Sequence, residues 1–293
     1  MSQLAYAYAL AAISTLCWGV VVVPIKLTRL SGKLGIGISM LTGALATSLV
    51  AGRELGAFAV LPWTEMARFA VTGTFQFTLG CMLYYESIRR GSMSIAVPVT
   101  RVKVILVLAF TLALGLETFT WWLLGACVLV VLGGILLGLQ TNCAPEGESR
   151  DGHRMSLLLA MGACVCWGAG ETLIGTLPDS INAVAKNALL LWCGLVVYVG
   201  YALVSGTWRR FAGVQRRDIL CYVTHGLVSF SVAYVLMVRA IEIAGPPRIS
   251  CITSTYPMIS AMIGWVFFRE RFSAAAVAGA CLLVAGVIVL QFG

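Results

Sequence analysis

The chain has 293 residues, of which 60% are hydrophobic and 11% are charged, and its mean hydropathy is +0.94. A soluble domain carries about 25% charged residues, so this composition excludes a water-soluble enzyme. The low charge also excludes a disordered chain and a coiled coil, which both need many more charged residues. The composition therefore predicts an all-α polytopic membrane protein embedded in a lipid bilayer.

The charged residues are 20 Lys and Arg against 12 Asp and Glu, which gives a net charge of +8. The basic residues lie in short clusters between apolar runs, where they determine membrane topology. They form no contiguous basic stretch, so we expect no nucleic-acid partner.

Ten apolar runs approach the ~20 residues that a helix needs to cross the hydrocarbon core. No basic residue precedes the first run and no cleavage site follows it, so we interpret it as a membrane helix and not as a signal peptide. The ten predicted spans cover residues 4–25, 34–52, 66–88, 93–116, 119–139, 155–175, 183–205, 219–238, 249–268 and 273–292.

Short motifs of the first half recur in the second half in the same order, 149 to 154 residues later. Trp18-Gly19 recurs as Trp167-Gly168, Thr72-Gly73 as His225-Gly226, Glu117 as Glu270, and Gly125-Ala126-Cys127 as Gly279-Ala280-Cys281. The chain is therefore predicted to contain two five-helix repeats, 1–140 and 155–293, joined by a polar connection at 141–154. Five is odd, so the second repeat enters the membrane inverted. Inverted repeats place a substrate site between the halves, near the midplane, and open it to either side.

The recurring residues also resemble a known family, the EamA-type branch of the drug/metabolite transporter superfamily. The resemblance is carried by Trp18-Gly19 with Lys26, by Trp167-Gly168, by Tyr256-Pro257 through Arg269-Glu270, and by Gly279 through Gly286. It implies two EamA repeats and secondary transport or exchange of small metabolites, often amino acids. One departure is that Lys103-Val104 stands where the second half has Tyr256-Pro257.

Charged residues inside membrane helices are costly, and they usually face a wet cavity. Glu171 is a candidate to bind a substrate ammonium group or a driving proton, and its alternative is a structural ion pair with Arg101 or Lys103. The two bases are two residues apart, hence ~200° apart around a helix, so only one is expected to face the cavity. Arg101 is favoured because a guanidinium suits a carboxylate or a phosphate. Lys26 and Lys186 lie near helix ends and can snorkel to the interface.

Aromatic residues and a histidine complete the predicted substrate site. Trp18 and Trp167 occupy equivalent places in the two halves, where their faces can bind cations or stack on flat solutes. Tyr256 precedes Pro257, which disturbs helix hydrogen bonding and exposes carbonyl groups. His225 is a candidate proton relay, with a hydrogen bond to a neighbour as the alternative.

Several other functions find no support in the sequence. It contains no P-loop, no HExxH and no GxSxG motif, so we expect neither an enzyme nor a cofactor. Cys164-Val-Cys166 lacks zinc spacing, no metal site is expected, and the ten cysteines are interpreted mainly as packing residues. Glu117 and Glu270 at helix ends are interpreted as caps or interhelical contacts, and Gly43 and Gly133-Gly134 as packing positions.

The two indications of membrane orientation disagree. The positive-inside rule places the odd-numbered connections in the cytoplasm and both termini outside, whereas the family resemblance implies both termini inside, in either case in a bacterial inner membrane. The odd connections carry Arg29, Lys33, Arg89, Arg90, Arg150, Arg154, Arg209, Arg210, Arg216, Arg217, Arg269 and Arg271, and the even ones carry Arg53, Arg68, Arg239 and Arg248.

The sequence therefore predicts a secondary transporter that moves a small polar metabolite by alternating access. One acid, nearby bases and aromatic walls suit a zwitterion such as an amino acid, with a coupling proton or a counter-substrate as a further partner. Two other cargoes remain open, namely an organic anion or sugar derivative and a quaternary ammonium such as choline. The alternative outside the carrier class is a membrane scaffold.

Overall fold

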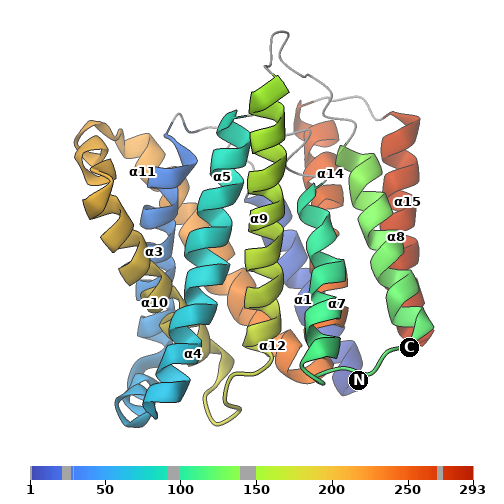
Figure 1. Cartoon of the computed structure of the whole chain (residues 1–293), viewed down its shortest axis with the longest axis horizontal. Coiled ribbons are helices and arrows are strands. Elements are labelled where there is room, and N and C mark those ends of the chain that lie inside the picture. The colour runs from blue at the N-terminus through green and yellow to red at the C-terminus, as the bar shows by residue number, and fades with distance from the viewer. Residues whose placement is uncertain are drawn as a thin grey trace.

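The computed structural model describes residues 2–21, 28, 30–90, 99–138, 150–268 and 273–292. Within these ranges the regular structure is entirely helical (Figure 1). Seven of the described helical segments are long and apolar enough to cross a membrane. They confirm a polytopic helical bundle, whereas the number of ten spans stays a prediction.

The first half consists of helices up to residue 138. They are α1 (Gln3–Val20), α3 (Gly32–Ala51), the 3-10 helix η1 (Gly52–Val60), α4 (Trp63–Gly73), the π-helix η2 (Thr74–Leu79), α5 (Gly80–Arg90), the 3-10 turn η3 (Thr100–Val102), α7 (Lys103–Ala113) and α8 (Trp121–Gly138). Ser2 caps α1 by accepting a hydrogen bond from the backbone nitrogen of Ala5 at 3.2 Å, which satisfies one of the free donors at a helix start.

The second half, from residue 150 onward, has a similar series of helices. Its elements are α9 (Arg150–Ile174), α10 (Ala183–Val204), η5 (Thr207–Gly213), α11 (Arg216–His225), the π-helix η6 (Gly226–Ala233), α12 (Tyr234–Ala244), α13 (Pro246–Thr253), α14 (Tyr256–Phe268), α15 (Ala274–Val289) and η7 (Leu290–Phe292). The predicted run at 249–268 is thus two helices. The first begins at Pro246, because proline suits the first helical position.

A feature that helical periodicity does not predict is the π-helix within the third span of each half. The segment α4–η2–α5 spans residues 63–90 and the segment α11–η6–α12 spans residues 216–244, so their starts are 153 residues apart (216 − 63). Single π-turns within α-helices are rare and often lie at functional sites. The corresponding residues Phe77 and Phe230 meet edge to face, with ring centroids 5.3 Å apart.

Glycines allow the two halves to pack closely in matching places. A Cβ atom on Gly73 would collide with the backbone carbonyl of Leu190, and one on Gly226 would collide with the carbonyl of Ser39. In the same way, a Cβ on Gly133 would lie 2.7 Å from the Gly279 carbonyl oxygen. Small residues let membrane helices approach in this way, which confirms the predicted role of Gly133.

The bundle has two distinct ends. The N- and C-termini lie together at the lower end in Figure 1, which we call the terminal end. Helices α5 and α8 finish at the opposite end, where α9 begins. Toward the terminal end the interior is closely packed by side chains that are at most 3% exposed, namely Ala7, Ala11, Val107, Ile241 and Ile249.

Candidate functional site

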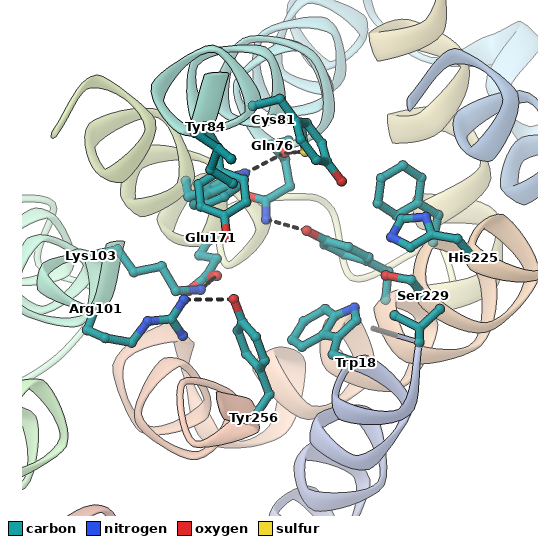
Figure 2. A pocket seen from close by; sticks show the side chains of 16 residues that line it. Trp18, Gln76, Cys81, Tyr84, Arg101, Lys103, Glu171, His225, Ser229 and Tyr256 are labelled. Carbon is teal, nitrogen blue, oxygen red and sulfur yellow. Dashed lines mark hydrogen bonds and ion pairs between the residues drawn. The ribbon is translucent and has the colours of Figure 1, made fainter. Parts of the chain in front are cut away.

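A cavity of about 380 Å³ lies between the two halves (Figure 2). Its lining includes Val21, directly after α1, and Ile88, in the last turn of α5, together with residues deeper in the bundle. All seven residues that the sequence singled out line it, from five helices and the turn η3: Trp18, Arg101, Lys103, Trp167, Glu171, His225 and Tyr256.

One wall of the cavity carries an ion pair between α7 and α9. The Lys103 ammonium donates to Oε1 of Glu171, and the two side chains are only 10% and 2% exposed. Oε2 of Glu171 has no hydrogen-bond partner within the described part of the chain. Since a buried charge is costly without a partner, each of these residues supplies the other with a partner of opposite charge.

Arg101 lies beside this pair and is held by α14. Its Nη2 donates to the hydroxyl of Tyr256 at 2.7 Å and to Oγ1 of Thr100 at 3.0 Å. The guanidinium carbon also lies 4.5 Å from the centre of the Tyr256 ring, a cation–π contact. These contacts position a planar group of hydrogen-bond donors at the cavity wall.

The prediction that only one of the two bases faces the cavity is wrong. Arg101 and Lys103 both line it (Figure 2). Residues 100–102 form a 3-10 turn, whose 120° per residue brings positions 101 and 103 closer in direction than the 100° per residue of an α-helix. Both side chains are also long enough to bend toward the same space. With Glu171 they give this wall a net charge of +1 (two cations, one anion).

The two tryptophans lie on different parts of the wall. Trp18 packs edge to face against Tyr234, with centroids 5.1 Å apart, and near Tyr256 at 6.4 Å. Trp167 donates from Nε1 to the backbone carbonyl of Gln76 at 3.1 Å. Aromatic rings thus line much of the space beside the charged groups.

The π-helices contribute cavity residues that sequence reasoning missed. Gln76 on η2 and Ser229 on η6 correspond to each other (229 − 76 = 153), and both line the cavity. Gln76 donates from Nε2 to the hydroxyl of Tyr234 at 3.0 Å. Neutral residues within apolar runs carry no signal of burial or direction, and only the recurrence at Thr72-Gly73 marked this region.

His225 lies across the cavity from the charged wall (Figure 2). Its Nδ1 is 2.9 Å from Oγ of Ser39 on α3. The ring also packs edge to face on Phe230, at 5.0 Å between centroids. The expected hydrogen bond to a neighbour is therefore present.

Two further predictions concern ion pairs outside the cavity. Lys186 does not snorkel, because its side chain is 1% exposed and binds Glu242 at 2.6 Å. The interhelical contact expected of Glu117 is confirmed, because Arg248 on α13 donates a hydrogen bond to its carboxylate at 2.8 Å.

Parts of the chain named in the sequence analysis lie outside the described residues. They are residues 141–149 of the connection and the side chains Lys26, Arg29, Arg269, Glu270 and Arg271. No cluster of described His, Cys, Asp or Glu side chains suits a metal ion.

Comparisons with known proteins agree with this geometry. The sequence model of the EamA-like transporter family matches residues 5–139 and 154–292. A protein of Archaeoglobus fulgidus described as an uncharacterized transporter is 25% identical over 223 residues, which cover 75% of this chain and 74% of that protein. A solved crystal structure described only as that of a protein has a TM-score of 0.78, 14% identity, and coverage of 98% of this chain and 96% of the other. At that identity the likeness shows the fold alone.

Proposed function

Because the chain belongs to the EamA-like transporter family, and is thus an integral multi-pass membrane transporter, we propose that it is a secondary carrier of a small polar metabolite that binds in the cavity between its halves. The observation that carries this proposal is the placement of Arg101 and the Lys103–Glu171 pair on one wall of that cavity. A membrane scaffold has no need of such buried charges, which are costly in a bilayer.

The substrate class that fits this wall is a zwitterion such as an amino acid. The guanidinium of Arg101 is a planar cation of the kind that binds carboxylates. Oε2 of Glu171, which is buried and has no hydrogen-bond partner among the described residues, would turn to accept the substrate ammonium, while Lys103 keeps Oε1. Opposite charges on the substrate then meet opposite charges on the same wall, and the aromatic rings cover the remainder of the molecule.

The net charge of the wall makes an organic anion or sugar derivative the second candidate. Two cations against one anion attract a negatively charged cargo more strongly than a neutral one. The same charges disfavour a quaternary ammonium such as choline, although Trp18, Trp167 and Tyr256 supply aromatic faces that attract cations.

Alternating access through two inverted repeats is the mechanism we propose. Its support is that α1 and α9, which begin the two halves, start at opposite ends of the bundle (Figure 1). Equivalent glycines also make equivalent contacts across the halves. The cavity reaches the last turns of α1 and α5 and is packed shut toward the terminal end. Rocking of the halves would close the cavity at the ends of α1 and α5 and open it toward the terminal end.

The coupling partner is proposed to act at Glu171. A proton bound there would neutralise the carboxylate and release Lys103, so that protonation and substrate binding compete for one group.

The charge bias of the connections supports termini outside the cytoplasm, and the cavity would then face the cytoplasm. The membrane that fits is the inner membrane of a bacterium.

Solute counterflow in proteoliposomes tests this function. Vesicles preloaded with one unlabelled amino acid are expected to accumulate the same labelled compound only when the native protein is present. Arg101→Met should abolish accumulation of zwitterions and anions and should leave any choline flux unchanged. An absence of counterflow for every amino acid and organic anion tested would contradict the proposal.

A further inference from the structure

The hydrogen-bond chain behind His225 determines which of its ring nitrogens carries the proton. Oγ of Ser39 lies 2.9 Å from the backbone carbonyl oxygen of Tyr222, and it must donate its single hydrogen there because a carbonyl oxygen only accepts. The same Oγ lies 2.9 Å from Nδ1 of His225. Because its hydrogen is donated to the Tyr222 carbonyl oxygen, the Ser39 hydroxyl is the acceptor in its bond with Nδ1 of His225. Nδ1 of His225 is therefore the N–H nitrogen.

A neutral imidazole with a proton on Nδ1 has a bare lone pair on Nε2. Nε2 of His225 has no partner within the described residues, and the ring is part of the cavity wall (Figure 2). Packing against Phe230 at 5.0 Å and Tyr222 at 6.3 Å holds the plane of the ring. The cavity thus contains a fixed hydrogen-bond acceptor on the side away from Arg101 and Lys103.

Neighbouring groups extend this neutral side. Gln76 Nε2 donates to the Tyr234 oxygen, so the phenolic hydrogen of Tyr234 is available to a ligand. Ser229 adds a hydroxyl one helical turn beyond His225. A cation would be a poor match here, because the lining already has a net charge of +1. The complementary ligand group is an uncharged donor, such as a hydroxyl or an amide N–H.

We propose that His225 Nε2, oriented by Ser39, binds an uncharged hydrogen-bond donor at the far end of the transported solute. This inference rests on the proposed function, since it assumes that the charged end of the solute is held by Arg101 and Glu171. His225 then acts as an acceptor that selects among substrates, and Ser39, which does not line the cavity, is a positioning residue.

The experiment compares ligands that differ only in the donor. Binding to the purified full-length protein in nanodiscs is measured for threonine against its isostere valine and for tyrosine against phenylalanine. The native protein should bind the hydroxyl-bearing member of at least one pair roughly three- to tenfold more tightly, the usual net effect of one hydrogen bond. His225→Phe should remove this preference, so that the two members of that pair bind with equal affinity.

Two further variants separate hydrogen bonding from packing. His225→Gln supplies an amide oxygen as a substitute acceptor and should keep part of the preference. Ser39→Ala should weaken it without altering the cavity lining, because Nδ1 then loses the acceptor that fixes its proton. If His225→Phe misfolds, these two variants still decide the matter.

The outcomes distinguish the role of His225 from the proposed carrier function on which it rests. Binding of both members of each pair without preference, or a preference that survives His225→Phe and Ser39→Ala, would overturn the role of His225 and leave the carrier function standing. Failure of the native protein to bind any of the four ligands, or binding that is unaffected by Arg101→Met, would overturn the proposed zwitterion site and this inference with it.

Discussion

Lys103 and Tyr256 occupy corresponding positions in the two halves (256 − 103 = 153), yet they differ in chemistry. Each is the first residue of its helix, α7 or α14, and each faces the cavity. Two residues before each lie Arg101 and Ser254. The helices of the two halves thus correspond in position here, whereas both cations of the charged wall, Arg101 and Lys103, come from the first half and the anion Glu171 comes from the second. Under the proposed duplication, similar helices from both halves frame the cavity, and a few differing side chains make its two walls different.

The largest effect is expected from breaking the charged wall. Glu171→Leu leaves the Lys103 ammonium buried without its partner, and loss of one member of a buried pair costs about 3–5 kcal/mol. Denaturant unfolding of the purified protein should show this destabilisation. The double variant Lys103→Met with Glu171→Leu, which removes both charges, should regain most of the stability and still fail to bind zwitterions. A single variant as stable as the native protein would contradict the pairing.

The matching of the two backbones predicts equal sensitivity at equivalent glycines. Gly73→Ala and Gly226→Ala each push a methyl group into a backbone carbonyl of the other half, so each should destabilise the protein by about 1–3 kcal/mol. Gly200→Ala on α10 is the control, because no atom lies within 4 Å of its added methyl. A large loss at only one of the two glycines would weaken the claim of equivalent packing.

A smaller effect is expected on the tyrosine side. Tyr256→Phe keeps the ring under the Arg101 guanidinium and removes only the hydroxyl that accepts its hydrogen bond at 2.7 Å. One hydrogen bond contributes about 0.5–1.5 kcal/mol, so the affinity for a carboxylate-bearing ligand should fall by roughly that free energy, measured by calorimetry. Unchanged affinity would mean that Tyr256 does not position Arg101.

Charge within apolar runs proved a good guide to the cavity. Arg101, Lys103 and Glu171 stood out because each is costly in a membrane, and all three line one wall. The directions of the Arg101 and Lys103 side chains were mispredicted, because the prediction assumed α-helical geometry where the chain forms a 3-10 turn. Lys186 was mistaken for an interfacial residue because its partner Glu242 is 56 residues away.

Neutral cavity residues could not be found from the sequence. Gln76 and Ser229 lie on π-helices, whose wider turn changes the direction of every later side chain, and nothing in their composition distinguishes them from ordinary spans. The proton position on His225 likewise depends on Ser39 and Tyr222, which meet it only in the fold.

Alternating access is the central claim, and two native cysteines allow a direct test of it. Sγ of Cys127 on α8 and Sγ of Cys251 on α13 are free thiols that lie 3.5 Å apart, one in each half of the chain. Copper-phenanthroline oxidation is followed by mass spectrometry to confirm the disulfide, and counterflow is then measured, with Cys251→Ser as control. The crosslinked native protein should still bind its ligand but stop counterflow until dithiothreitol is added, and the control should be unaffected. Counterflow at the native rate through fully crosslinked protein would contradict relative motion of the halves.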